Sequence, residues 1–299
     1  MTVANLRTTL VPADPERKPR DTELDLFGLT HIGKVRKENQ DQFLVCTVHQ
    51  QMVVHGTSLP EPERLPLRGE RLATILLAAD GVGGGQAGGE ASQLAVEAVT
   101  RYVSSTMLCV HAHSGLAEGE FLTALRAAAL DAHQAVRAAV TGRADTRTMA
   151  TTLTLAIFVW PNMYVVQVGD SRCYLFKDGA LHQVTRDQTV GQYMVDVGAL
   201  TAEQLVHSPL NRVLSSAIGG REAEPLVTRH ELNRTSRVLL CSDGLTKHVS
   251  NEEIAERIKA RESSEQFCHA LLDLALERGG TDNITVLSGR LQGPVSALP

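Results

Sequence analysis

The fold of this chain is decided by one stretch, Leu76-Leu-Ala-Ala-Asp-Gly-Val-Gly-Gly-Gly-Gln-Ala-Gly-Gly-Glu90. The apolar run Ile75 to Ala79 is too short for a helix and apolar enough to be a buried strand. Asp80 stands where that strand is expected to end. Gly81 follows at once, so the backbone can turn there and its carbonyl can approach a ligand closely. A carboxylate held on a rigid strand end is a suitable ligand for a hard cation.

Two other interpretations of this stretch stay open. Residues Gly83 to Gly88 match the G-x-G-x-x-G spacing of a dinucleotide-binding loop, but no acidic residue stands roughly 20 positions further on. Asp80 would also place negative charge beside a pyrophosphate. No Lys-Ser or Lys-Thr pair follows the glycines, which excludes a P-loop. The simplest alternative is a structural joint between a strand and a helix, with no ligand.

The composition is typical of a globular protein. The chain has 299 residues, of which 43% are hydrophobic and 21% charged, which suits one large domain or two small ones. The net charge of -5 and the lack of a long basic cluster argue against nucleic acid as a partner. No apolar run reaches the roughly 20 residues that cross a bilayer, and the N-terminus lacks an apolar signal core. We therefore expect a cytoplasmic protein that does not bind membranes, with reduced, scattered cysteines.

The first half of the chain combines strands with long helices. Residues 1–23 mix prolines with charges and are expected to be a flexible tail. Apolar residues within Leu24–Gly28 and Phe43–Val48 predict two antiparallel strands. Glu90–Met107 and Glu120–Val140 carry small and apolar residues at helical spacing, so both are predicted to be helices.

The second half is rich in strands. Thr151–Val159 alternates and is β-branched, as expected of a strand. Lys177-Asp-Gly179 predicts a type I′ hairpin turn, and strands joined by such turns form an antiparallel sheet. Residues 185–220 form a polar, helical excursion, and residues 292–299 are expected to be a C-terminal tail.

Four acids share one property: each flanks a predicted strand, in segments far apart in the sequence. They are Asp41, Asp80, Asp243 and Asp282. One such aspartate is usually a turn former, but Asp-Gly pairs follow two buried strands here. If the acids converge, their like charges raise one another's pKa and oppose folding, and divalent cations remove that cost. Ligands that are all oxygen favour Mg²⁺ or Mn²⁺ over zinc or copper.

Seven short motifs occur in one order along the chain. They are Arg36-Lys-Glu-Asn-Gln-Asp41, Asp80-Gly-Val-Gly-Gly84, Ala87-Gly-Gly-Glu90, Thr151-Thr152, Val168-Gly-Asp-Ser-Arg172, Ser242-Asp-Gly-Leu-Thr246 and Gly280-Thr-Asp-Asn283. In these motifs the sequence resembles the metal-dependent serine/threonine protein phosphatases of the type 2C family, in their bacterial form. The resemblance implies a single phosphatase domain over residues 24–291, with a flap at about 185–220. It also implies an α+β fold, a four-layer α/β/β/α sandwich of two central antiparallel sheets flanked by helices.

The resemblance implies a metal-ligand role for five residues. Asp80 is expected to bridge two Mn²⁺ or Mg²⁺ ions, with the Gly81 carbonyl on the first ion. Asp243 and Asp282 are expected to bind the second ion. Asp41 is expected to act as a ligand partly through water.

The activity implied by the resemblance is hydrolysis of phosphoserine and phosphothreonine in proteins. A water shared by the two ions would attack phosphorus in line with the leaving oxygen. Arg36 and Asp80 would be the catalytic residues, because the planar fork of Arg36 suits a substrate phosphate better than a lysine does. Taken alone, Arg36 would be interpreted as a solvated loop charge. The partners would be phosphoproteins and an opposing serine/threonine kinase, and we expect a monomer.

Three positions depart from the pattern of the family. Gln40 stands where many members have a glutamate, and Val82 where animal members have a histidine proposed as general acid, so no protein general acid is named. Thr148 stands where bacterial members often have an aspartate that serves a third ion, and Asp145 lies three residues earlier. The sequence thus predicts two ions and leaves a third open. A catalytically silent relative that binds partners through the same fold is the alternative, although the retained acids argue against it.

Overall fold

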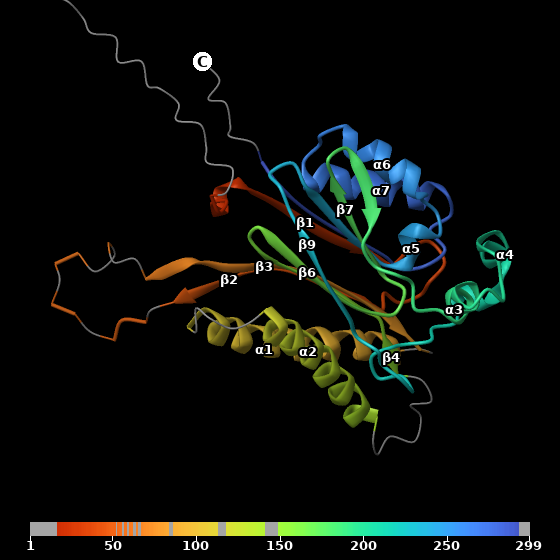
Figure 1. The fold of residues 1–299 in the computed structure, drawn as a ribbon, viewed down its shortest axis with the longest axis horizontal. Helices are drawn as coiled ribbons and strands as arrows, with labels where there is room; N and C mark the ends of the chain where they lie inside the picture. Colours follow the sequence, from red (N-terminus) through yellow and green to blue (C-terminus); the bar gives the residue numbers. More distant parts are fainter. Residues whose placement is uncertain are drawn as a thin grey trace, which may run out of the picture.

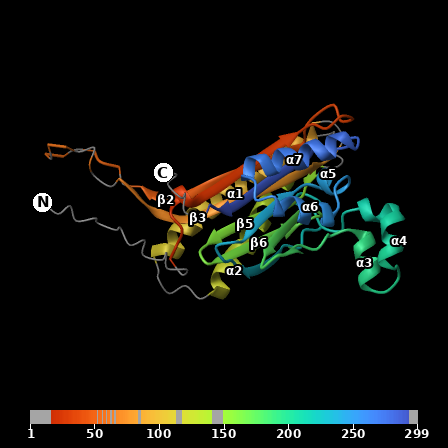
Figure 2. The ribbon, with the colours of Figure 1, turned by 90° about the horizontal axis from the view of Figure 1, so that it is seen from above.

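The strands of this chain form two antiparallel sheets that stack face to face, with helices on both outer faces (Figures 1 and 2). This arrangement confirms the predicted four-layer α+β sandwich. The computed structural model describes residues 17–292 apart from residues 52, 56, 59, 62–63, 65–66, 84–85, 113–117 and 141–148. Residues 1–16 of the predicted N-terminal tail (1–23), residues 293–299 of the predicted C-terminal tail (292–299), and the positions Asp145 and Thr148 lie outside the described residues. Residues 17–23 differ from the expected flexible tail, because the buried Arg71 donates to the Pro19 carbonyl at 2.7 Å and a 3-10 turn follows. No helix in the described part of the chain is long and apolar enough to cross a bilayer.

The two sheets draw their strands from both halves of the chain. Sheet A has the order β1 (Leu24–His31), β11 (Ile284–Leu291), β10 (Arg237–Cys241), β7 (Arg172–Lys177) and β8 (Ala180–Gln183). Sheet B has the order β2 (Asp41–Gln51), β3 (Arg68–Val82), β5 (Leu153–Val159), β6 (Asn162–Val168) and β9 (Leu226–Glu231), with β4 (Ala150–Thr151) paired to the end of β3.

The helices belong to three groups. Sheet B is covered by α1 (Ala87–Ala112) and α2 (Glu118–Val140), and sheet A by α5 (Asp243–Thr246), α6 (Asn251–Lys259) and α7 (Ser264–Glu277). The excursion contains α3 (Val190–Asp196), α4 (Ala202–His207) and a 3-10 turn (Pro209–Arg212). A second 3-10 turn (Asp21–Glu23) precedes β1. Both ribbon views show α3 and α4 standing away from the sandwich, at the end where α5 lies (Figures 1 and 2).

Strand β3 shows why the layers form. Its side chains point alternately to opposite faces, and both faces are apolar. Ile75 and Leu77 pack against α1 and α2, whereas Leu76 and Ala78 pack between the sheets. All four are buried. A strand that is apolar on both faces is stable only between two other layers, so β3 lies inside the sandwich.

Two details differ from the sequence-based expectation. The first two predicted strands exist as β1 and β2, but they lie in different sheets, with β1 paired to β11 and β2 to β3. Strand β3 does not end at Asp80, because Gly81 and Val82 continue it by pairing with β4. The predicted hairpin turn is confirmed, since Asp178 and Gly179 both have positive φ values, 52° and 83°.

Candidate metal centre

The acids at the ends of β2 and β3 are neighbours within sheet B. Asp41 begins β2 and is the register partner of Asp80 across the β2–β3 ladder. The Asp41 side chain is bound from the other sheet, because its Oδ2 accepts hydrogen bonds from Ser242 Oγ at 2.8 Å and Thr285 Oγ1 at 2.7 Å. Ser242 lies between β10 and α5, and Thr285 lies in β11. Asp41 therefore connects the two sheets at one end of the sandwich.

The acids of sheet A are held together by a lysine. Asp243 is the first residue of α5, directly after β10, and Asp282 stands two residues before β11. Lys247 Nζ lies 2.6 Å from Asp243 Oδ2 and 2.7 Å from Asp282 Oδ2. Because one ammonium contacts both carboxylates, the two acids lie side by side.

Arg36 also belongs to this cluster, although its partner is not the one expected from the sequence. Its Nε lies 2.6 Å from Asp282 Oδ1, and its Nη2 donates to Asp282 Oδ2 at 2.8 Å. The guanidinium is thus bound in a fork to a carboxylate. The same geometry is the one that binds a phosphate.

The backbone around Asp80 is tightly fixed. Its amide donates to Thr152 Oγ1, and its carbonyl accepts from the Thr152 amide and from Thr151 Oγ1, all at 2.9 Å. Gly81 has no space for a side chain, because a Cβ there would overlap the main-chain oxygens of Gly88 and Gln40. These contacts hold the backbone of Asp80 and Gly81 in one position.

A fifth acid, Asp170, lies in the same electrostatic environment. It follows β6 and Gly169, so an acid beside a glycine stands at the end of a strand, as at Asp80 and Asp243. The next residue, Ser171, shares a hydrogen bond of 2.8 Å with Thr152, so this turn and the Asp80 backbone are fixed by one threonine. The motif Val168-Gly-Asp-Ser-Arg172 was noted in the sequence, but no role was predicted for Asp170.

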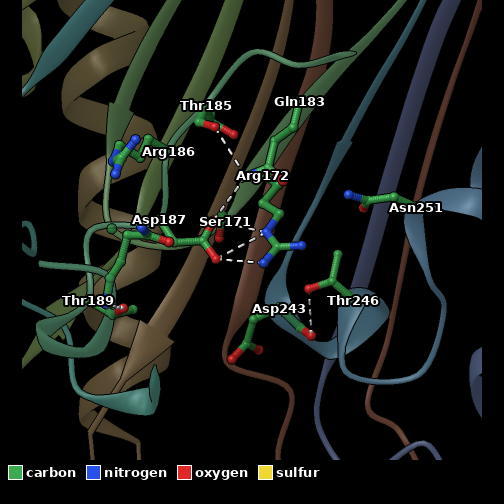
Figure 3. A network of polar contacts seen from close by, with 12 residues as sticks. Ser171, Arg172, Gln183, Thr185, Arg186, Asp187, Thr189, Asp243, Thr246 and Asn251 are labelled. Carbon is green, nitrogen blue, oxygen red and sulfur yellow. Dashed lines mark hydrogen bonds and ion pairs between the residues drawn. The ribbon is translucent and has the colours of Figure 1, made fainter. Parts of the chain in front are cut away.

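The neighbouring Arg172 anchors the start of the excursion. Its guanidinium donates to both oxygens of Asp187, at 2.6 Å for the shortest bond (Figure 3). It also donates to the Tyr174 hydroxyl. Tyr174 in turn donates to Asn251 Oδ1 at 2.9 Å. Figure 3 shows the Arg172–Asp187 pair in the same view as Asp243 and Asn251. The base of residues 185–220 is therefore tied to the same end of the sandwich as the acids.

The pKa values show which acids lack a compensating charge. Burial, opposed by the Thr285 and Ser242 hydrogen bonds, raises the pKa of Asp41 to about 6. Burial and then Asp41, Asp243 and Asp170 raise the pKa of Asp80 well above its usual value.

The pKa values of Asp170 and Asp282 are shifted in opposite directions. Burial and the charges of Asp243 and Asp187 raise the pKa of Asp170 to about 7. Burial would also raise the pKa of Asp282, but hydrogen bonds from Arg36 and Lys247 outweigh it and leave that pKa below its usual value. Asp41, Asp80 and Asp170 are thus the uncompensated part of the cluster.

The donor set fits a hard divalent cation. Asp41 Oδ1 and Asp243 Oδ1 are buried and have no hydrogen-bond partner, although buried carboxylate oxygens normally have one. Oxygen donors of this kind suit Mg²⁺ or Mn²⁺. Among the described residues, no three His, Cys, Asp or Glu side chains are already arranged as ligands of one ion. The acids instead form an ion-paired cluster in which Lys247 and Arg36 take part of the carboxylate oxygens.

Two of the departing positions also border the cluster. Gln40 packs its side-chain amide against Gly88 at the start of α1, and its carbonyl accepts from Ser92 Oγ at 2.6 Å. Val82 is 39% exposed and lies next to Gly81. Neither residue has a side chain that can serve as a general acid.

Sequence reasoning and structure agree on which residues meet. Arg36, Asp41, Asp80, Asp243 and Asp282 all lie in this cluster. The residues that it missed are Asp170, Lys247, Ser242 and Thr285. For Lys247 the available signal was its spacing, four residues after Asp243 on a short helix, where side chains meet.

A family model described as protein phosphatase 2C matches residues 67–282 of the chain. The chain belongs to the protein phosphatase 2C family. Among its relatives, the serine/threonine protein phosphatase PstP of Mycobacterium tuberculosis is 39% identical over 215 residues, which cover 72% of this chain and 40% of that protein. The serine/threonine phosphatase stp of Listeria welshimeri is 31% identical over 216 residues, covering 71% of this chain and 82% of that protein. The match thus spans less than half the length of PstP.

Solved structures of the protein phosphatase 2C family share the whole sandwich. The crystal structure of PstP from Mycobacterium tuberculosis superposes with a TM-score of 0.71 at 33% identity, covering 90% of this chain and 99% of that one. A structure of the PstP catalytic domain in complex with two manganese ions has a TM-score of 0.68 at 32% identity, covering 90% of this chain and 99% of that one.

Proposed function

We propose that this protein is a Mn²⁺- or Mg²⁺-dependent phosphatase that hydrolyses phosphoserine and phosphothreonine in proteins. One observation carries the proposal: acids from four separate segments meet at one end of the sandwich, where Asp41 Oδ1 and Asp243 Oδ1 are buried without partners. The fold family and the two manganese ions bound by the related PstP domain support it.

In this proposal Asp41, Asp80, Asp243 and Asp282 hold two ions, together with the Gly81 carbonyl. Such ions, when bound, lower the pKa of a water and neutralise charge on the transferring phosphoryl group. The chain itself fixes part of the geometry, because hydrogen bonds hold the Asp80 backbone and the Asp41 carboxylate in place.

Arg36 is proposed to bind the substrate phosphate. Its guanidinium forms a fork with Asp282 in this structure. Since a phosphate offers the same pair of acceptors as a carboxylate, a phosphate that takes the Nε–Nη2 edge of Arg36 exchanges with Asp282. That exchange frees both Asp282 oxygens from the guanidinium. Val82, at the position where animal members have a histidine proposed as general acid, cannot donate a proton.

We further propose that residues 185–220 act as a flap that selects protein substrates. Its helices stand clear of the sandwich beside the cluster, and Tyr193, Val197 and Val206 are exposed on it. Exposed apolar side chains in one region favour contact with another protein. Deleting residues 192–210 should alter preference among phosphopeptides and leave turnover of a small aryl phosphate largely intact. Equal loss of both activities would contradict this role.

The physiological partners are proposed on the same basis. The substrates would be phosphoproteins made by an opposing serine/threonine kinase, and the phosphatase would act as a monomer in the cytoplasm. The free thiols of Cys46, Cys173, Cys241 and Cys268 support a reducing compartment.

Hydrolysis of an aryl phosphate and of a phosphothreonine peptide tests the proposed activity directly. Turnover should require Mn²⁺, cease with a chelator, and be lost in the Asp80→Asn variant. Asp273→Asn, at an exposed position on α7, is the matched control and should keep full activity. Mn²⁺ uptake without turnover of either substrate would instead indicate a silent relative that binds partners.

A further inference from the structure

Lys247 lies inside the acidic cluster and not at its rim. It directly follows α5, and its side chain is only 27% exposed. Its ammonium contacts one oxygen of Asp243 at 2.6 Å and one of Asp282 at 2.7 Å. Both acids are proposed metal ligands, so a protein cation already occupies oxygens that a divalent ion would use.

The two halves of the acidic cluster therefore differ in their contacts with protein cations. On the side of sheet A, Lys247 and Arg36 contact Asp243 and Asp282. On the side of sheet B, Asp41 Oδ2 accepts from the hydroxyls of Ser242 and Thr285, and its Oδ1 has no hydrogen-bond partner in the described part of the chain. A divalent cation that enters the sheet B half displaces no protein cation, whereas one that uses Asp243 and Asp282 has to compete with an ammonium.

We propose that Lys247 is a built-in counter-cation, which holds Asp243 and Asp282 together in the metal-free protein and must be displaced before a divalent ion can use both. The inference rests on the proposed function, since it needs these acids to be metal ligands. A lysine suits this task because its charge sits on a flexible four-carbon stem and can swing away without moving the backbone.

The inference makes two predictions of opposite sign for one substitution. Lys247→Met keeps most of the length of the side chain and removes its charge. Without the competing ammonium, the lowest-affinity Mn²⁺ step should tighten about tenfold, or a further step should appear, as expected from losing one charge-assisted contact. The metal-free variant should also melt about 3 °C lower or more, because two carboxylates lose their compensating charge.

Isothermal titration calorimetry with Mn²⁺ and thermal unfolding in a chelator measure these two effects without any turnover assay. Lys247→Arg keeps the charge and should retain wild-type values in both. Lys259→Met, at an exposed position of α6 paired with Glu256, is the matched control and should change neither. A merely structural role would lower stability and weaken Mn²⁺ binding together.

The outcomes separate the two proposals. Unchanged or weaker Mn²⁺ binding in Lys247→Met, with normal uptake by the wild type, overturns the counter-cation and leaves the proposed function intact. No Mn²⁺ uptake by the wild type overturns the proposed function, and the counter-cation with it. Tighter binding combined with a lower metal-free melting temperature supports both.

Discussion

The acidic cluster should make the metal-free protein less stable as pH rises, which is the reverse of ordinary acid denaturation. Asp41 has a pKa of about 6 in the folded protein, against an ordinary value of 3.8. The folded state therefore binds more protons than the unfolded state between these values, and the free energy of unfolding falls as pH increases through that window. The loss begins above about pH 4 and is complete above about pH 7.

The size of the effect follows from the same shift. A difference from 3.8 to about 6, at about 1.4 kcal/mol per pKa unit, amounts to on the order of 3 kcal/mol in full. About 2 kcal/mol of it should be lost between pH 4.5 and 7.5. Asp170, with a pKa of about 7, and Asp80 act in the same direction and add to the loss.

Urea unfolding in a chelator, at pH 4.5 and 7.5, measures this free energy. His133 and His230 act oppositely below about pH 6.5, since burial lowers their pKa values. The wild type should therefore be compared with Asp41→Asn, which keeps the shape and removes the titrating group. Relative to that variant, the wild type should lose about 2 kcal/mol at the higher pH, and saturating Mn²⁺ should abolish the loss. The reasoning would be refuted if the free energy of unfolding of the wild type, relative to that of Asp41→Asn, stayed constant or increased from pH 4.5 to 7.5.

Three substitutions test other parts of the site. Asp80→Asn should remove the gain of about 2.7 kcal/mol that Mn²⁺ at 100 times its Kd gives the wild type, measured by urea unfolding; an unchanged gain would contradict the proposed ligand. Gly81→Ala should cost about 2 kcal/mol or more, because the methyl group overlaps main-chain oxygens, whereas Gly119→Ala on α2 has open space and should cost nothing. Asn283→Ala should cost about 2–4 kcal/mol, since its side chain makes hydrogen bonds to the main chain of residues 32, 38 and 40; a shift below 1 kcal/mol would count against that bracing role.

The sequence predicts those parts of the fold that depend on residues close together in the chain. The capping box at Thr201–Gln204 and the glycines after α7 mark helix ends where the structure has them. Strand partners are not local. The separation of β1 and β2 into different sheets depends on β11, which arrives some 250 residues later and takes the place beside β1.

The same limit applies to the prediction of the site. Asp41, Asp80, Asp243 and Asp282 could be identified because each stands beside an apolar strand. Their cations could not, because the pairing of Lys247 with two acids depends on how α5 and β11 come together. Nothing in the sequence around Arg36 indicates that its partner in this structure is Asp282.

The position of β11 inside sheet A, between β1 and β10, sets the order in which the site can be completed. It pairs with β1 on one side and β10 on the other, and it brings Asp282 and Thr285 with it. During synthesis the other acids leave the ribosome first, but Asp41 lacks one of its two hydroxyl donors until this strand inserts. A nascent or truncated chain that stops before residue 284 therefore has neither a finished sheet nor a finished acidic cluster, so the proposed activity requires β11.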